Sequence, residues 1–263
     1  MSESTSLNLN QCEASSEVYK EIQEVVAKLG NLVNQITLSH PPDNDLLKYF
    51  ENNQANLIFK WMHYFEIYER HFSRFRNKEV YIVEIGVFHG GSLQMWRDYF
   101  GANATIYGVD INNQCKKFEE ERIKILIGDQ GDKSFLKTLK EQCPRIDILI
   151  DDGSHLMEHL KTTFEELFPH ISENGVYLAE DLHTCYWSEF GGGYKNSNSF
   201  IEYTKNLIDQ LNGYHSKDTE SFRVSDFTRS AQSIHYYDSV VVIEKRKVEP
   251  PCNKATGVPT LNI

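Results

Sequence analysis

The hydrophobic pattern of the chain changes near residue 75. Apolar residues recur at helical spacing over residues 15–38, and a second helical region, rich in aromatic side chains, runs from about Asp45 to Phe72. The two prolines of "HPPDN" (residues 40–44) separate these regions, because proline cannot continue a helix. We therefore predict an N-terminal helical extension over residues 1–75, in which the polar residues 1–14 are disordered.

After residue 75 the pattern becomes that of a parallel sheet. Short apolar segments rich in β-branched residues recur, each separated by enough chain for a helix: "VYIVEIG", "TIYGVDI", "IKILIGD", "IDILIDD" and "GVYLAED". Such runs, alternating with helices, indicate a parallel sheet covered on both faces. The segment "SIHYYDSVVVIEKRK" predicts an antiparallel hairpin with a turn near Asp238–Ser239, and an irregular tail is expected from Pro250 onward. Residues 76–263 are thus predicted to form one α/β domain with a mostly parallel sheet.

Acidic residues stand at or near the carboxyl end of every predicted parallel strand: Glu84, Asp110, Asp129, Asp151 with Asp152, and Glu180 with Asp181. In open α/β sheets this edge is where ligands bind. Helix capping by Asp explains one or two such positions. It does not explain carboxylates along the whole edge, so we predict a ligand site there.

The glycine loop after the first strand, "VEIGVFHGGSLQMW", departs from a dinucleotide fingerprint. Phe88 stands where the second glycine of G-x-G-x-x-G is needed for contact with a pyrophosphate. The loop therefore favours a ligand without phosphate, such as S-adenosylmethionine, whose methionine part can lie over Gly86. Asp110, 24 residues after Gly86, is placed to accept hydrogen bonds from ribose hydroxyls, and Asp129 can meet the adenine amino group.

Three further acids predict a cation site. Asp152 ends the fourth strand, and Glu180 and Asp181 end the fifth. Adjacent strands lie roughly 4.8 Å apart, so these carboxylates can converge, and together they need a cation. Oxygen ligands favour Mg²⁺, with Mn²⁺ or Ca²⁺ as alternatives. Asp151 points the other way along the strand and is expected to be structural. His155, in the turn after Asp152, can take a proton from a substrate hydroxyl.

The segment "EDLHTCYWSEFGGGYKNSN" after the fifth strand predicts an acceptor pocket. His183, Tyr186 and Trp187 can line it, since sugars stack on aromatic rings and bond to their polar tips. An ordinary surface loop with a buried aromatic anchor is the alternative. The three glycines from Gly191 to Gly193 would allow the loop to move as a lid.

These motifs together resemble a known enzyme family. The order E-x-G-x-x-x-G-G, Asp110 and Asp129 is similar to that of class I S-adenosylmethionine-dependent methyltransferases, which have a Rossmann-like fold. More narrowly, "HYFEIYERHF", "GGSLQMW", "IGDQ", "DDGSH", "TFEELFPH", "AEDLHTCYW", "GGGY" and "SIHYYDSVVVIEK" resemble the macrocin and mycinamicin sugar O-methyltransferases over about residues 57–245. The larger macrolide enzymes of this family carry an extra N-terminal domain that this chain is too short to hold.

The resemblance implies roles for individual residues. The implied metal ligands are Asp152, Glu180 and Asp181, and the implied base is His155. The cofactor-binding residues expected from the loop and the strand ends are Glu84, Gly86, Gly90, Ser92, Asp110, Asp129 and Gln130.

The expected function is metal-dependent transfer of a methyl group from S-adenosylmethionine to a hydroxyl, in a deoxysugar of a glycoside, nucleotide-sugar or glycan. A catechol-like phenol is the alternative acceptor, because its two adjacent oxygens would also chelate the metal. A non-catalytic S-adenosylmethionine-binding module is the alternative of another class; no metal ligand and no base is missing, which disfavours it. An NAD-dependent sugar enzyme is disfavoured by Phe88 in the glycine loop.

The composition of the chain indicates which partners and which cellular compartment to expect. The 263 residues carry a net charge of -11, which disfavours nucleic acid and anionic membranes as partners. Five cysteines without C-x-x-C spacing indicate reduced thiols, and neither a signal peptide nor an apolar run of about 20 residues is found. We expect a cytoplasmic enzyme. The apolar stripe of residues 18–36 can pack on a second subunit, giving a homo-oligomer, or cap the domain.

Overall fold

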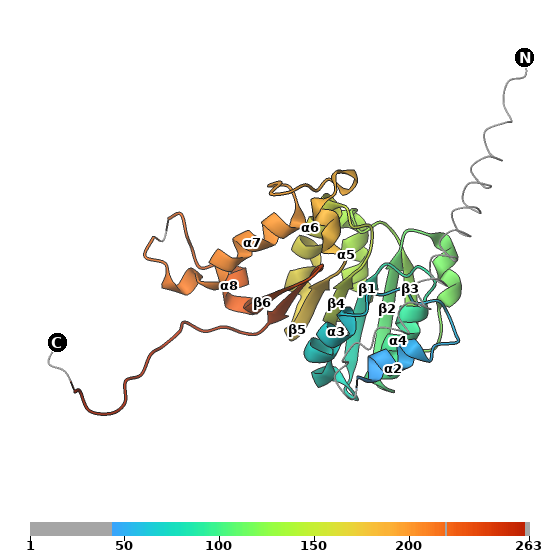
Figure 1. The fold of residues 1–263 in the computed structure, drawn as a ribbon, viewed down its shortest axis with the longest axis horizontal. Helices are drawn as coiled ribbons and strands as arrows, with labels where there is room; N and C mark the ends of the chain where they lie inside the picture. The colour runs from blue at the N-terminus through green and yellow to red at the C-terminus, as the bar shows by residue number, and fades with distance from the viewer. Residues whose placement is uncertain (1–43, 219, 261–263) are drawn as a thin grey trace, which may run out of the picture. The chain divides into compact units, whose positions relative to one another are not determined.

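The computed structural model describes residues 44–218 and 220–260 (Figure 1). The predicted disordered segment 1–14 and helix 15–38 lie outside these residues. The described helices are α2 (Asp45–Glu51), α3 (Tyr64–Phe72), α4 (Gly91–Phe100), α5 (Lys133–Gln142), α6 (Met157–Leu167), α7 (Phe200–Leu211) and α8 (Asp226–Ser230). The strands are β1 (Val80–Ile85), β2 (Ala104–Asp110), β3 (Ile123–Ile127), β4 (Ile146–Asp151), β5 (Ile171–Ala179), β6 (Ala231–Tyr237) and β7 (Val240–Lys245).

The strands form one sheet in the order β3-β2-β1-β4-β5-β7-β6. β1 to β5 are parallel, and β7 adds antiparallel to both β5 and β6. The predicted α/β fold, with its parallel sheet and antiparallel C-terminal hairpin, is confirmed. The order reverses between β1 and β4, so the carboxyl ends of these strands border the crevice in which doubly wound sheets bind ligands.

The central strands are buried on both faces, which explains their unbroken apolar runs. Alternate side chains of each strand enter two separate cores. One core includes residues of α2, α3 and α4, and the other residues of α5, α6 and α7, so the helices form a layer on each side of the sheet (Figure 1). This packing holds the strand ends, and the acids on them, in a fixed arrangement.

The predicted continuous helical region from Asp45 to Phe72 is wrong in its middle. α2 ends at Glu51, and the Asn52 side chain donates to the carbonyl of Lys48 in its last turn. Residues 52–63, here called the strap, connect α2 to α3 without regular helix. Asparagine competes for backbone hydrogen bonds and so ends helices, and "NNQAN" places three asparagines at this point.

The predicted domain division at residue 75 does not coincide with a break in packing. Leu46, Tyr64, Tyr68 and Phe72 lie in the same apolar core as Ile82 of β1. Residues from Asn44 onward form one compact unit. α2 and α3 are therefore part of the unit that carries the candidate site.

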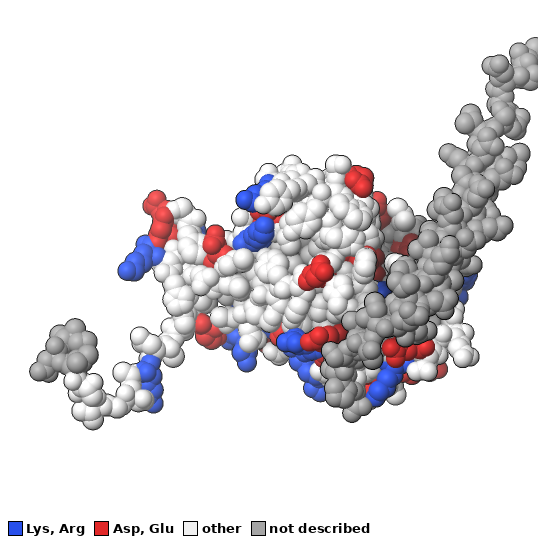
Figure 2. All heavy atoms as spheres, in the orientation of Figure 1, with Lys and Arg blue, Asp and Glu red and all other residues white. Residues whose placement is uncertain are grey.

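Charged side chains of both signs lie on the face of the molecule drawn in Figure 2. On the face shown in Figure 2, Lys and Arg side chains are interspersed with Asp and Glu around the periphery. No helix among residues 44–218 and 220–260 is both long and apolar enough to cross a membrane. The described cysteines, Cys115, Cys143, Cys185 and Cys252, are all free thiols.

Candidate active site

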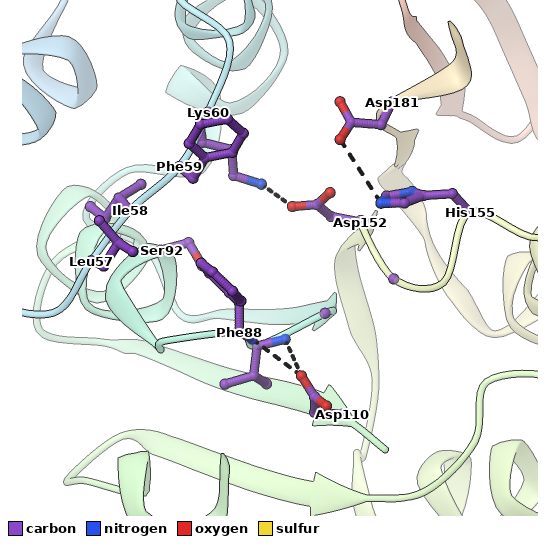
Figure 3. A pocket seen from close by; sticks show the side chains of 13 residues that line it. Leu57, Ile58, Phe59, Lys60, Phe88, Ser92, Asp110, Asp152, His155 and Asp181 are labelled. Atoms are coloured by element: carbon purple, nitrogen blue, oxygen red, sulfur yellow. Dashed lines mark hydrogen bonds and ion pairs between the residues drawn. The ribbon is translucent and has the colours of Figure 1, made fainter. Parts of the chain in front are cut away.

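A cavity of about 340 Å³ lies at the carboxyl edge of the sheet and is lined by the strap, the glycine loop and the ends of β2 and β4 (Figure 3). A second cavity of about 190 Å³ adjoins it. Gly86, Asp110 and Gly153 line both cavities, so the two are continuous around the end of β1. This is the place where the sequence predicted a ligand.

The glycine loop is shaped by its neighbours. Gly86 has a φ of 98°, and a Cβ atom there would lie 2.0 Å from the backbone oxygen of Asp152. Only glycine fits this close approach between the ends of β1 and β4. Across the loop, Asp110 accepts hydrogen bonds from the backbone N–H of Val87 (2.9 Å) and Phe88 (3.2 Å). Asp110 therefore fixes the loop and still borders both cavities.

Two residues predicted to bind the cofactor, Gln130 and Ser92, also have buried protein partners. The Gln130 amide donates to Asp151 Oδ1 (3.0 Å) and accepts from the Ser154 backbone N–H (2.7 Å). Ser92 donates to Glu84 Oε2 (2.7 Å), and Glu84 is fully buried. Gln130 and Ser92 still line the cavities, but these bonds give their side chains a positioning role. Gly90, at the start of α4, has a φ of 76°.

Asp129 lies at the far end of the smaller cavity, where its side chain is about half exposed. Its carboxylate accepts from the Gly131 backbone N–H (2.8 Å), and His159 Nδ1 lies 3.8 Å away. From Asp110 to Asp129, the cavity thus presents carboxylate oxygens along the ends of β2 and β3. Asp110 and Asp129 both line this smaller cavity.

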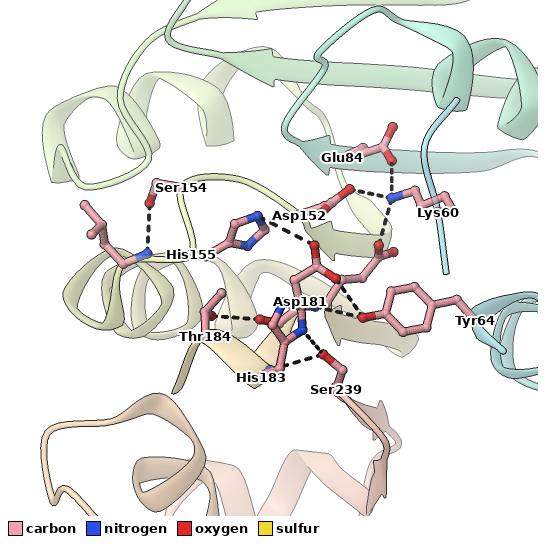
Figure 4. A network of polar contacts seen from close by, with 12 residues as sticks. Lys60, Tyr64, Glu84, Asp152, Ser154, His155, Asp181, His183, Thr184 and Ser239 are labelled. Atoms are coloured by element: carbon pink, nitrogen blue, oxygen red, sulfur yellow. Dashed lines mark hydrogen bonds and ion pairs between the residues drawn. The ribbon is translucent and has the colours of Figure 1, made fainter. Parts of the chain in front are cut away.

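His155, Asp152 and Asp181 meet at the other end of the larger cavity (Figure 4). One potential ligand atom from each lies within 4.8 Å of the others, and His155 Nε2 is 3.9 Å from Asp181 Oδ2. Both His155 (φ 58°) and Asp181 (φ 53°) adopt the left-handed region, which is uncommon for residues with a Cβ atom. Backbone strain of this kind is typical of functional sites.

The residue that sequence reasoning missed is Lys60 of the strap. Its ammonium lies 2.5 Å from Asp152 Oδ2, 2.7 Å from Glu180 Oε2 and 3.6 Å from Glu84 Oε1, and its side chain is 4% exposed. The only signal in the sequence is a lysine within the apolar "LIFKW". A lone lysine of this kind usually reaches solvent, so this pattern does not predict that Lys60 is buried.

Two tyrosines of α3 complete the contacts to the acids. Tyr68 donates to Glu180 Oε1 (2.6 Å), and Tyr64 donates to Asp181 Oδ1 (2.7 Å). Both rings belong to the apolar core, as their spacing predicts, while their hydroxyls reach the carboxylates. Glu180 is therefore held by Lys60 and Tyr68 on its two oxygens, whereas Asp152 and Asp181 each keep one oxygen toward His155 and the cavity.

Burial raises the pKa of several of these acids. Desolvation raises the pKa of Asp151 to about 7, and it also raises the pKa of Glu84. For Lys60, burial alone would lower the pKa, but Asp152, Glu180 and Glu84 outweigh that effect and raise it well above its usual value. Lys60 therefore stays protonated, and the acids at the carboxyl edge of the sheet favour the binding of positive charge.

The chemistry of the donors fits a hard divalent cation. Asp152 and Asp181 offer carboxylate oxygens, which Mg²⁺ prefers, and the ammonium of Lys60 shows that the acids already hold a cation. Among the described residues, the buried Nδ1 of His155 has no hydrogen-bond partner. Glu180 lies against Lys60 rather than in the group of Asp152, His155 and Asp181, so its predicted ligand role stays a prediction.

A series of neighbouring aromatic rings runs from Trp61 to His155, which lies beside Asp181. Successive ring centroids are 6.0 Å (Trp61–His183), 4.9 Å (His183–Trp187), 6.0 Å (Trp187–Phe190) and 6.3 Å (Phe190–His155) apart. Trp61 and Trp187 are 51% and 45% exposed. We call these five residues the aromatic wall. Exposed tryptophans are typical of sites that bind sugars or other partly apolar ligands.

Of the predicted acceptor residues, His183 and Trp187 belong to this wall, and Tyr186 lies beside it. His183 Nδ1 is 2.6 Å from Ser239 Oγ, in the turn between β6 and β7. Tyr186 is 51% exposed and shares with His183 a hollow of about 200 Å³. Gly191 and Gly193 adopt positive φ values, and the backbone of the loop is closed by a hydrogen bond from the Gly193 N–H to the Cys185 carbonyl (2.8 Å).

Comparison with known proteins identifies relatives of this arrangement. Residues 83–182 match a family described as a methyltransferase domain. The chain is 38% identical over 199 residues to the demethylmacrocin O-methyltransferase of Streptomyces fradiae, covering 71% of this chain and 50% of that protein. It is also 38% identical over 193 residues to an 8-demethyl-8-alpha-L-rhamnosyl tetracenomycin-C 2'-O-methyltransferase of Streptomyces olivaceus, covering 70% of this chain and 50% of that protein.

A solved structure shows the same fold. The MycE methyltransferase of the mycinamycin biosynthetic pathway, in complex with Mg, S-adenosylhomocysteine (SAH) and mycinamycin VI, superposes with a TM-score of 0.68 at 33% identity. The superposition covers 84% of this chain and 56% of that one. The chain thus spans about half the length of the relatives it matches.

Proposed function

We propose that this chain, which is similar to the macrocin and mycinamicin type of sugar O-methyltransferases, methylates a hydroxyl of a sugar acceptor, using S-adenosylmethionine and a divalent cation. The observation that carries the proposal is the convergence of Asp152, His155 and Asp181 at one end of a cavity whose other end fits a nucleoside. This convergence supports the binding of a methyl donor beside a metal-dependent acceptor site.

The nucleoside end provides the cofactor contacts. Gly86 leaves room for the amino acid part of S-adenosylmethionine, while Asp110 is positioned for the ribose hydroxyls and Asp129 for the adenine amino group. S-adenosylmethionine supplies the methyl group as a sulfonium, an electrophile that carries a positive charge. The acidic edge favours that charge, and Phe88, 60% exposed at the rim, can exclude water above it.

The acceptor end provides the base. Asp152 and Asp181 would hold the cation, with Glu180 as the further ligand expected from the resemblance. A bound Mg²⁺ would lower the pKa of an acceptor hydroxyl and orient it. His155 Nε2 faces the same space and would take the hydroxyl proton, because its neighbour Asp181 stabilises the imidazolium that forms. The aromatic wall would bind the sugar ring.

The sugar acceptor is supported by the relatives. The proteins that this chain resembles are named for methylation of macrolide and rhamnosyl-tetracenomycin glycosides, and one solved relative holds mycinamycin VI. The exposed tryptophans of the aromatic wall agree with a glycoside. Small glycosides with a free hydroxyl are therefore the first acceptors to test, with catechols as the competing class.

Calorimetric titration tests the proposal most directly. SAH should bind with micromolar affinity and NAD should give no signal. Methyl transfer from labelled S-adenosylmethionine to a panel of rhamnosides and other deoxysugar glycosides should stop with EDTA and resume with excess Mg²⁺. Absence of SAH binding would refute the methyltransferase proposal, and transfer to catechols alone would refute the sugar acceptor.

A further inference from the structure

Lys60 is a buried cation that the proposed reaction does not use. Its ammonium has three N–H donors and is surrounded by three acids, Asp152, Glu180 and Glu84, which end the neighbouring strands β4, β5 and β1. Two of these acids, Asp152 and Glu180, are also expected ligands of the divalent cation. Lys60 therefore occupies a position next to, or within, the site that an external cation must enter.

The strap that carries Lys60 is built to lie close over this edge. A Cβ atom on Gly91 would be 2.4 Å from the Asn56 carbonyl oxygen and 2.5 Å from that of Leu57, so glycine at this position lets the strap pass directly over the start of α4. From Leu57 to Trp61 the exposure alternates as in an extended strand: Leu57, Phe59 and Trp61 are 47%, 66% and 51% exposed, whereas Ile58 and the Lys60 side chain are buried.

The same residues link the strap to both ligands of the proposed reaction. Leu57 and Phe59 line the larger cavity, and Trp61 begins the aromatic wall (Figure 3). Lys60, pointing inward between them, is the polar anchor of this stretch. A change in the contacts of Lys60 would consequently shift the residues that line the cofactor cavity and the first residue of the aromatic wall.

We propose that Lys60 is a built-in counter-ion that competes with the divalent cation for Asp152 and Glu180, so that binding of the cation loosens the strap. This inference rests on the proposed metal-dependent function. Two cations that share carboxylates in a poorly solvated site repel each other. Without metal, the ammonium of Lys60 reduces the repulsion among the acids, and its contacts keep the strap against the sheet edge. When the divalent cation is bound, it neutralises the acids in place of Lys60.

The first test is Mg²⁺ titration of wild type and Lys60→Met by calorimetry at constant ionic strength. Methionine keeps the length and apolar stem of lysine but removes its charge. We expect Lys60→Met to bind Mg²⁺ about tenfold more tightly or better, because the competing charge is gone. The metal-free variant should have a lower Tm than wild type, and Mg²⁺ should raise its Tm by more than it raises that of wild type. Equal or weaker Mg²⁺ affinity would overturn the competition.

Two controls are matched to this variant. Lys60→Arg keeps the charge and should not gain Mg²⁺ affinity. Lys205→Met removes a half-exposed lysine that pairs with Glu202 on α7, and should behave as wild type. A gain of affinity in Lys205→Met equal to that in Lys60→Met would show that net charge alone is responsible, and would overturn the specific role of Lys60.

The second test uses the wild-type protein and does not depend on folding of a variant. Hydrogen exchange of peptides that cover residues 52–63, measured by mass spectrometry, should become faster when Mg²⁺ is added. Unchanged or slower exchange would overturn the coupling to the strap. SAH titration of the same samples separates the proposals: failure to bind SAH would refute the methyltransferase function, while the Mg²⁺ experiments would still decide the role of Lys60.

Discussion

Two histidines of this molecule, His71 and His155, show how a structural polar cluster differs from a reactive one. His71 of α3 is 2% exposed, and both its ring nitrogens have partners: Glu244 Oε1 at 2.6 Å and the Tyr237 hydroxyl at 2.9 Å. His155 borders the cavity, and its buried Nδ1 has no hydrogen-bond partner among the described residues, while Nε2 lies 3.9 Å from Asp181.

The carboxylates beside the two histidines differ in the same way. Glu244 pairs with His71 and Arg74, and these hydrogen bonds lower its pKa to about 2 despite partial burial. At the acidic edge, several carboxylates share the single ammonium of Lys60, and burial raises the pKa values of Glu84 and Asp151. A satisfied cluster stabilises the fold, whereas a cluster with too few partners is prepared to bind a ligand.

The largest effect should come from His155→Ala. If His155 is the base, turnover should fall by about 10²- to 10⁴-fold, because proton removal from the acceptor would lose its catalyst. SAH affinity, measured by calorimetry, should stay unchanged, since His155 lies at the other end of the cavity. The matched variant is His71→Ala, which should lower the Tm but keep the turnover of the folded protein. Near-wild-type turnover in His155→Ala would exclude the role of base.

The second prediction concerns pH and Asp151. Its pKa is raised in the folded state, so the folded protein binds this proton more tightly than the unfolded chain. The associated stability is present below pH 4 and is lost as pH rises through about 7, by up to about 4 kcal/mol. Urea unfolding at pH 5 and pH 8 should show that Asp151→Asn is less sensitive to pH than wild type. A variant with an unchanged pH slope would contradict the raised pKa.

Glu244 should respond to pH in the opposite direction. Its lowered pKa means that its contribution is present above its ordinary value of 4.5 and is lost as pH falls toward 2. At neutral pH, Glu244→Gln should reduce the free energy of unfolding by about 1–3 kcal/mol, because His71 and Arg74 lose a charged partner. Chemical denaturation at pH 7 and pH 3 checks this, and the cost should be smaller at pH 3. SAH affinity serves as the control and should not change.

The smallest effect is expected at the aromatic wall. Trp61→Ala should raise the KM for a glycoside acceptor by about tenfold, a loss of roughly 1.4 kcal/mol, because a sugar would lose a stacking surface. Turnover at saturation should change little, since Trp61 is not close enough to take part in proton removal. Ile208→Ala on α7, which removes another exposed apolar side chain, is the control. An unchanged KM in Trp61→Ala would remove Trp61 from the acceptor site.

The sequence by itself determined the sheet and the place of the site. The apolar runs of β1 to β5 are long enough to specify buried parallel strands, and the acids that follow them must gather at one edge because parallel strands end together. The turn at Asp238–Ser239 was also readable, since two short β-branched runs flank it. These features depend on short stretches of sequence, or on the alternation of side chains along a strand.

Only the tertiary structure decided how the acids are held. Lys60 lies 92 residues from Asp152 and 120 from Glu180 along the chain, and its strap was read as helix because aromatic residues recur on both sides of it. Likewise, Gln130 and Ser92, which the sequence predicts to contact the cofactor, also form hydrogen bonds with Asp151, Ser154 and Glu84 that no local pattern specifies. Contacts between distant segments depend on tertiary packing, which no local sequence pattern specifies. In this protein, packing places the ammonium of Lys60 among the acids.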